Sequence, residues 1–438
     1  MKIKTTMFLV VVLALIVFNG AAVCAGELRA GLARIDITPE KPVQLMGYSS
    51  RTDLSTGVHD PLYARAAVFE NDGKRLVLVS TDIIGYYAAF KQIHAELLAD
   101  FDLQPDELFL SAIHTHSAPT LMIDEANGHP NNIEYTKQLT QKLQTVIGDA
   151  FNALAPVGIG AGVGYSPVGM NRREMKENGA IWLGRNPYGV TDKEVLVMKI
   201  ARADGSPVGA LFDYATHATS LGPGNLMISG DVLGIAGQFV ETILGNDIIA
   251  PVFAGASGNI DPWFRVLPEF TSDAGWIPEP VLLGTLLGEE AVHVYRGIED
   301  IQSGGTVTTS QTIVHCPAKI VNEDDDANRG KLQYKRYDGN RAEDDRTTKP
   351  ITVSVARVGD VAFVGISTET VTEIGLEIKA ASPFKHTFII THCNGSDGYL
   401  ASEELYKEGG YEVWRTPYGL SSADMVVKEA LRMLYENL

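Results

Sequence analysis

Apolar runs that end in polar or turn-forming residues divide the chain into strands, and a second set of segments has helical periodicity. The runs predict strands over residues 30–39, 64–69, 75–81, 107–113, 195–202, 207–214 and 248–255, and a strand pair over 351–366. The periodicity predicts helices over residues 86–100, 133–154, 234–244, 280–295 and 421–438. Asn71-Asp72-Gly73 predicts a hairpin turn. Since the elements alternate without a strict rhythm, we expect an α/β fold with mixed β-sheets flanked by helices.

The N-terminus has the pattern of a secretory signal. Lys2 and Lys4 precede an apolar run over residues 7–18, and small residues follow before Gly26. The run is too short to span a membrane, so we predict a signal peptide over residues 1–25 that is cleaved after Ala25. A lipoprotein anchored through Cys24 ranks second, because a residue smaller than valine is expected before such a cysteine. The mature chain is therefore expected to be secreted or periplasmic.

Charge narrows the class of partner. The chain has 54 acidic and 36 basic residues, which gives a net charge of -18. Such a surface repels nucleic acid and anionic membranes, so we expect neither as a partner. Cys316 and Cys393 could form one disulfide or remain as two unrelated buried thiols. Nothing in their surroundings marks either cysteine as catalytic.

The strand over residues 107–113 ends in His114-Thr115-His116. On a strand, residues two apart point to the same face, so the two rings are expected to converge. Two imidazoles aimed at one point can hold a metal, or a metal and a reacting group beside it. The alternative is that one or both histidines simply make hydrogen bonds inside a core.

Other apolar strands also end in polar residues. The strand over residues 207–214 leads to His217, and Asp231 follows in a turn that either caps a helix or orients a metal-bound histidine. A strand ending at Glu369 brings a carboxylate, which either favours the next helix N-terminus or joins the histidines. The segment 388–411 is dense in Asn, Gly, Asp and Tyr, a composition that lines pockets or simply packs.

These segments together resemble the N-terminal catalytic domain of the neutral/alkaline non-lysosomal ceramidase family. The resemblance spans nearly the whole mature chain. It implies a single catalytic domain over residues 26–438, with a charged loop or insertion at 322–349 and without the family's additional C-terminal β-sandwich domain. The motifs that carry it are GLARIDITP (31–39), MGY (46–48), VHDPLYAR (58–65), STD (80–82), HTHSAP (114–119), NRR (171–173), HATS (217–220), SGD (229–231), Glu369 and residues 394–411.

In that family a single zinc ion lies at the floor of a pocket. Carried over residue by residue, its ligands fall on His114, His217, Glu369 and Tyr399. The resemblance also implies that His116 lies beside the metal as a hydrogen-bonding or proton-transfer group.

Further positions follow from the same resemblance. A family arginine matches Arg172 best, with Arg173 a close rival, and a substrate-pocket tyrosine matches Tyr411. The family has a serine where this chain has Asp261. A carboxylate cannot replace a hydroxyl nucleophile, so we expect Asp261 to act as a general base for the attacking water. The alternative is a turn carboxylate before Pro262.

The resulting hypothesis is an exported zinc-dependent hydrolase that cleaves an N-acyl amide bond, ceramide-like or related, by metal-activated water. His116 would protonate the leaving amine, and Tyr411 or Arg172 would stabilise the oxyanion.

Two other functions remain open. The first is a zinc hydrolase of the same fold that acts on a polar ester, lactone, peptide-like or glycan-derived substrate. The second is a catalytically silent ligand-binding relative, against which the retained ligand set argues. A long apolar channel would favour an acyl chain, and a short polar cleft would favour the polar substrates. Candidate rim residues are Trp263, Phe264, Trp276 and Trp414.

Overall fold

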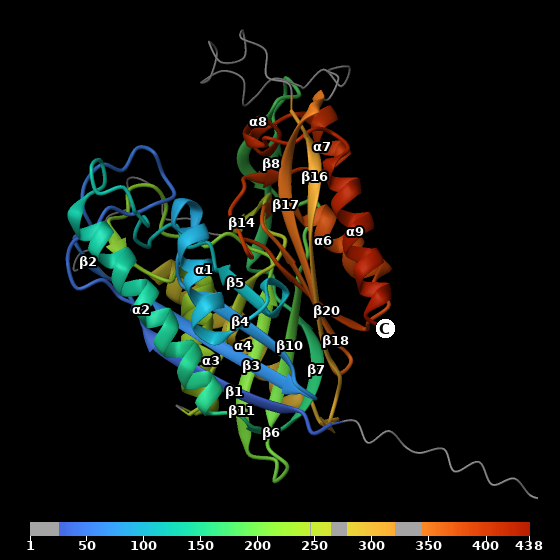
Figure 1. Cartoon of the computed structure of the whole chain (residues 1–438). Helices are drawn as coiled ribbons and strands as arrows, with labels where there is room; N and C mark the ends of the chain where they lie inside the picture. Colours follow the sequence, from blue (N-terminus) through green and yellow to red (C-terminus); the bar gives the residue numbers. More distant parts are fainter. Residues whose placement is uncertain (1–25, 246, 264–277, 320–343) are drawn as a thin grey trace, which may run out of the picture.

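The computed structural model describes residues 26–245, 247–263, 278–319 and 344–438 (Figure 1). The predicted signal peptide and residues 322–343 of the predicted charged loop lie outside this range. Residues 344–349, which we expected in that loop, instead continue strand β17 (Asp344–Val358). Within the described residues, no helix is long and apolar enough to cross a membrane.

The first of three main sheets contains the predicted N-terminal strands. Its order is β5 (Leu108–Ala112), β4 (Lys74–Thr81), β3 (Tyr63–Asn71), β1 (Arg29–Asp36) and β6 (Ala155–Pro156). Strands β3 and β4 form the predicted hairpin. Asp72 and Gly73 in its turn both have positive φ, at 48° and 75°, as a type I′ turn requires.

The other two large sheets combine distant parts of the chain. The second has the order β13 (Val252–Ala254), β11 (Pro207–Tyr214), β10 (Glu194–Ala201), β7 (Gly158–Tyr165) and β15 (Gln302–Ser303). The third has the order β16 (Val307–Ala318), β17, β18 (Val361–Ile366) and β20 (His386–Ile390). Both contain parallel and antiparallel pairs, which confirms the mixed α/β prediction.

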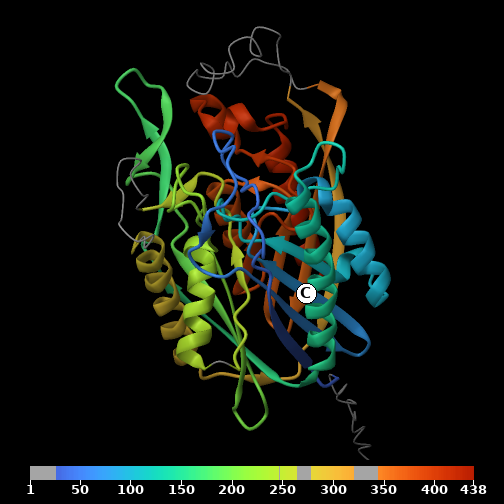
Figure 2. The ribbon, with the colours of Figure 1, turned by 90° about the vertical axis from the view of Figure 1, so that its left-hand side faces the viewer.

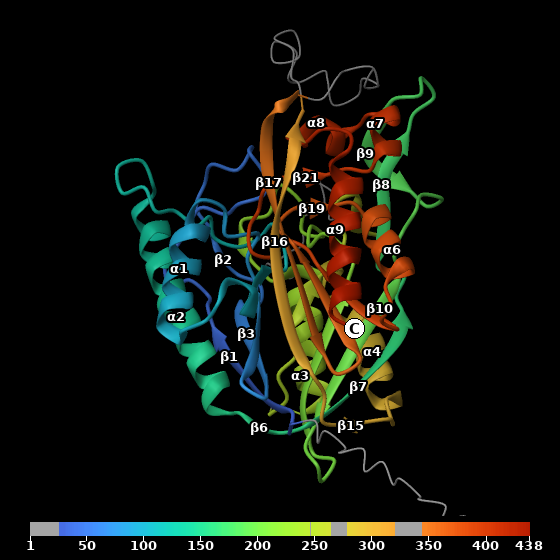
Figure 3. The ribbon, with the colours of Figure 1, turned by 45° about the vertical axis from the view of Figure 1, so that its right-hand side comes forward.

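Each large sheet has a pair of helices on its outer side (Figures 1–3). These are α1 (Phe90–Phe101) with α2 (Pro130–Asn152), α3 (Asp231–Leu244) with α4 (Pro278–Gly297), and α6 (Thr372–Ala381) with α9 (Ser422–Glu436). The inner faces of all three sheets share one core, which includes Leu78, Leu211 and the stacked rings of Phe363 and Phe388. Burial of this surface is the main force that holds the sheets together.

Shorter elements complete the described chain. They are β2 (Gly57–Val58), η1 (Tyr87–Ala89), η2 (Pro105–Glu107), β8 (Gly169–Met175), β9 (Ile181–Asn186), β12 (Met227–Ile228), β14 (Ile260–Pro262), β19 (Glu369–Thr370), β21 (Tyr399–Leu400), α7 (Glu403–Glu408) and α8 (Tyr411–Arg415). Cys316 and Cys393 are buried in different core clusters and form no disulfide with each other, which decides between the two alternatives for them.

Parallel strand pairs determine where the polar strand ends meet. The pairs β4–β5, β11–β13 and β18–β20 are parallel. In α/β folds, ligands bind beyond the carboxyl ends of such strands. Here those ends lead to His114, His217, Glu369 and His392, which come from four strands yet gather at one place.

Candidate metal centre

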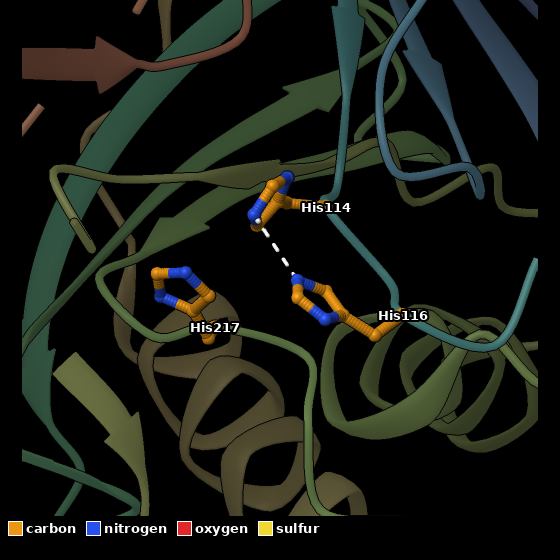
Figure 4. A group of neighbouring side chains, drawn as sticks. All are labelled: His114, His116 and His217. Atoms are coloured by element: carbon orange, nitrogen blue, oxygen red, sulfur yellow. Dashed lines mark hydrogen bonds between the residues drawn. The ribbon is translucent and has the colours of Figure 1, made fainter. Parts of the chain in front are cut away.

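His114 and His116 converge, but not by the strand alternation we predicted. Strand β5 ends at Ala112, and His114 has a φ of 60°. This left-handed backbone turns the chain, and the rings approach until their Nε2 atoms are 3.3 Å apart (Figure 4). A non-glycine residue with positive φ costs about 1–3 kcal/mol, and such strain concentrates at functional sites.

The backbone fixes which ring nitrogen faces the site. His114 Nδ1 donates to the Ile84 carbonyl at 2.8 Å, and His217 Nδ1 donates to the carbonyls of Ser257 and Ile260 at 2.8 and 3.0 Å. With the proton on Nδ1, each ring presents the lone pair of Nε2 to the site. Metal-binding histidines are oriented by this kind of hydrogen bond.

Glu369 faces both lone pairs. Its Oε2 lies 3.5 Å from His114 Nε2 and 3.6 Å from His217 Nε2, and this buried oxygen has no hydrogen-bond partner. Burial alone would raise the pKa of Glu369, but the neighbouring His114 and His217 hold it well below its usual range. Two imidazole nitrogens and a carboxylate oxygen therefore face one another, and the Glu369 oxygen meets no hydrogen-bond donor.

A metal ion fits this arrangement. Tetrahedral zinc with bonds of about 2.0–2.2 Å places its ligand atoms roughly 3.3–3.6 Å apart, which matches the spacings around Glu369. Both His114, His116, His217 and His114, Glu369, His392 place their ligand atoms within 4.8 Å of one another. His116 thus lies as near as the residues expected to be ligands.

Tyr399 is placed beside Glu369 by strand pairing. The two residues are direct partners in the parallel pair β19–β21. The Tyr399 hydroxyl accepts a hydrogen bond from Arg172 Nη2 at 3.1 Å. Burial, reinforced by the charge of Glu369, raises the pKa of Tyr399 well above its usual value. The structure thus brings together all four residues expected to be ligands.

Arg172 connects the centre to its supports. It donates through Nε to Glu412 at 2.9 Å and through Nη1 to Asp261 at 3.2 Å, and Nη1 also lies 3.3 Å from His217 Nε2. Arg173 instead donates to Glu412 and Glu408 at 2.6 and 3.0 Å. Of the two rivals, Arg172 is therefore the one that reaches the centre.

Asp261 lies behind Arg172. Its side chain is 1% exposed, with Oδ1 facing Arg172 and Oδ2 lying 3.7 Å from Arg185 Nη1. The residue is not among those that line the pocket. This position does not favour the general-base role we expected, because both carboxylate oxygens face guanidinium groups rather than the space for a substrate.

His116 is held from two sides. A Cβ on Gly47, whose φ is 112°, would lie 2.5 Å from His116 Cγ, so only glycine allows this close approach. Arg51 donates to the carbonyls of Met46 and His116. Burial, together with the neighbouring His114 and His217, lowers the pKa of His116 well below its usual value, so the ring is neutral.

A pocket of about 420 Å³ opens over the centre. Small-molecule sites typically measure about 300–1,000 Å³. The lining residues are Leu45, Met46, Gly47, Tyr48, Ser49, Ile84, Tyr87, His114, His116, Thr120, Glu369, Gly398, Tyr399, Tyr411 and Arg415. Of the expected rim residues, Trp263 and Trp414 are not in this lining, and Phe264 and Trp276 lie outside the described residues. The lining mixes apolar and polar groups, so the pocket is neither the long apolar channel nor the short polar cleft that we considered.

Sequence reasoning missed His392. Its ring stacks on His114 with centroids 3.9 Å apart and planes 12° apart, and its buried Nδ1 has no hydrogen-bond partner. Its φ of 51° is also left-handed. The sequence does contain a signal for His392, because this histidine follows the apolar strand β20 just as His217 follows β11. We interpreted the segment that contains it only as pocket lining or packing.

Asp231 supports a loop rather than a histidine. Its carboxylate accepts hydrogen bonds from the backbone N–H groups of Ser220, Leu221 and Val232. It thereby ties the segment that follows His217 to the first turn of α3. Neither expected role is observed, because the N-cap of α3 is Gly230 and the Asp231 carboxylate contacts backbone groups rather than a histidine.

Comparison with known proteins identifies the family. The model of the family described as neutral/alkaline non-lysosomal ceramidase, N-terminal, matches residues 28–257, just over half of the chain. The chain belongs to this family. The match includes His114, His116, Arg172 and His217, whereas Glu369 and the other predicted site residues lie beyond it.

Curated relatives and solved structures agree with this assignment. Neutral ceramidase 1 of Arabidopsis thaliana is 30% identical over 51% of this chain and 30% of its own length. Neutral ceramidase of Pseudomonas aeruginosa is 28% identical over 55% of this chain and 38% of its own. The chain thus spans roughly a third of these relatives. The crystal structure of neutral ceramidase from Pseudomonas aeruginosa matches with a TM-score of 0.75 and 21% identity, over 94% of this chain and 75% of that one, which shows a common fold.

Proposed function

We propose that this chain is an exported, zinc-dependent hydrolase of ceramidase type that cleaves an N-acyl amide bond. His114, His217, Glu369 and Tyr399 would hold the zinc ion. Zinc in such a site supplies Lewis acidity, which polarises a carbonyl and lowers the pKa of water. Membership of the ceramidase family and relatives named as neutral ceramidases support the amide bond as the target.

One observation carries the metal part of the proposal. Two imidazole lone pairs, fixed by Nδ1–H bonds to carbonyls, face a buried carboxylate oxygen that has no hydrogen-bond partner. Such a group of acceptors is unfavourable without a cation, because an unsatisfied buried acceptor costs about 1–3 kcal/mol and a charged one more.

The residues around the centre suggest a division of roles. His116 lines the pocket beside the metal centre, so it is placed to deliver a proton to a leaving amine. Burial raises the pKa of Tyr411, which keeps its hydroxyl protonated as a donor toward a developing oxyanion. Arg172 would hold Tyr399 and His217 in place, with Glu412 and Asp261 fixing the guanidinium from behind.

A substrate panel tests the proposal. The purified mature protein is incubated with a short-chain ceramide, N-lauroylethanolamine, N-lauroylglycine and matched esters, and released amine and fatty acid are quantified. We expect amide cleavage that stops with a chelator and returns with zinc. His114→Ala should abolish it, and His315→Ala, an exposed histidine on β16, should not. Cleavage of esters alone would favour the polar-ester alternative, and no cleavage by the zinc-loaded protein would favour the silent binding relative.

A further inference from the structure

The pocket contains an arginine that the proposed hydrolysis does not use. Arg415 ends helix α8 and lines the pocket that Tyr411, four residues earlier, also lines. Residues four apart on a helix share a face, so both side chains reach the same space. Arg415 is exposed, and among the described residues its guanidinium contacts the Trp414 ring at 5.5 Å without a carboxylate partner.

The neighbouring arginines show how unusual this is. Arg172 pairs with Glu412 and Asp261, and Arg173 pairs with Glu412 and Glu408. In a chain with 54 acidic residues, an arginine in a pocket without a carboxylate partner is available to a ligand. The other charged residue that lines the pocket is Glu369, which belongs to the metal centre.

Two hydroxyl groups accompany Arg415. Tyr87 and Tyr411 both line the pocket, and neither hydroxyl donates to an acceptor within the part of the chain that is described. Arg415 lines the same pocket as both rings, and burial raises the pKa of both phenols, which keeps their hydroxyls protonated as donors. Tyr87 has a φ of 41°, a strained conformation that supports a functional position for its side chain.

The chemistry of these groups points to an anion. A guanidinium binds a carboxylate with two parallel hydrogen bonds, and phenol hydroxyls add further donors. A single arginine matches one negative charge, which favours a carboxylate over a dianionic phosphate. Leu45, Met46 and Ile84 form an apolar part of the same lining, suited to an alkyl chain.

We propose that this pocket selects amides that carry a carboxylate, which Arg415 and Tyr87 bind while Tyr411 remains the donor to the oxyanion. The inference rests on the proposed function for the position of the scissile amide. It identifies the substrate class as N-acyl amino acids or amides of dicarboxylic acids, rather than uncharged N-acyl lipids.

Binding of non-hydrolysable sulfonamides separates this inference from catalysis. N-dodecylsulfonylglycine and N-dodecylsulfonylethanolamine differ in their carboxylate, and titration calorimetry on zinc-loaded protein gives both affinities. A second pair, 11-sulfamoylundecanoic acid and undecanesulfonamide, places the carboxylate at the other end and so distinguishes the two substrate types. We expect at least one carboxylate ligand to bind about 10- to 100-fold more tightly than its neutral partner.

Variants locate the preference. Arg415→Gln should remove the carboxylate preference and leave the neutral ligand's affinity unchanged, and Arg415→Lys should retain part of it. Lys407→Gln, a matched surface change on α7, should retain all of it. Equal affinities within both pairs, or a preference that survives Arg415→Gln, would overturn the inference even if amides are cleaved. Because binding is measured without turnover, failure of the proposed hydrolysis would be seen separately in the substrate panel.

Discussion

Asp261→Asn distinguishes a positioning residue from a general base. The substitution preserves shape and removes the charge that Arg172 Nη1 meets at 3.2 Å. Leaving a buried charge wholly unpaired costs about 3–5 kcal/mol. Arg172 keeps Glu412 at 2.9 Å, so we expect the free energy of unfolding, measured in urea, to fall by the smaller cost of one charged hydrogen bond, about 1.5–3 kcal/mol.

The effect on turnover decides the role. If Asp261 acts only through Arg172, kcat/KM on the best amide should fall about tenfold, with zinc content and the shape of the pH profile unchanged. Glu412→Gln removes another partner of Arg172 and should produce a comparable fall, with the double variant less than additive. A general base would give a different result: in Asp261→Asn, kcat/KM would fall roughly 10²–10⁴-fold and the acid limb of the pH profile would be lost. If Glu412→Gln showed no similar effect, the positioning role would be refuted and Asp261 would be the general base.

Three further predictions test the supports of the site and the stability of the fold. Gly47→Ala should displace His116 and lower kcat at unchanged zinc content, whereas Gly205→Ala, where a Cβ meets nothing within 4 Å, controls for the cost of a positive φ. His392→Ala should weaken zinc affinity about 10- to 100-fold in a chelator competition, because His114 loses its stacking partner; unchanged affinity would argue against this support. Burial raises the pKa of Asp213 to about 7, so its stabilisation is present below about pH 4 and is lost as pH rises to 7. Asp213→Asn should remove that loss, up to about 4 kcal/mol in urea unfolding, and an unchanged pH dependence would contradict it.

Hydrophobic pattern was a good guide to the elements whose two faces differ. Helix α2 and the β3–β4 hairpin were predicted close to their observed bounds, because one face packs and the turn residues suit positive φ. Strand β7 was missed because every second residue of its sequence, GIGAGVGY, is glycine. Its glycines are explained by the close packing of α4 and of the residues that follow it, since a Cβ at Gly164 would lie 2.2 Å from Glu290 Oε1 and one at Gly160 would lie 2.3 Å from the Asp300 carbonyl oxygen.

In the site, too, the sequence predicts single residues but not how they come together. Strand ends that carry His114, His217 and Glu369 could be identified in the sequence, because a polar residue directly after an apolar strand is a local signal. Their convergence depends on parallel pairing between distant strands, which no local pattern contains. The part played by Arg172 depends in turn on Glu412, 240 residues away. Such long-range contacts required the structure.

The central claim is a metal centre built on His114, His217, Glu369 and Tyr399, and zinc content tests it most directly. Elemental analysis would be made on the mature protein, His217→Ala and His315→Ala, each after reconstitution with zinc and desalting. We predict close to one zinc per chain in the wild type and His315→Ala, and a loss in His217→Ala. Absence of zinc from all three proteins, or its full retention in His217→Ala, would contradict the proposed centre.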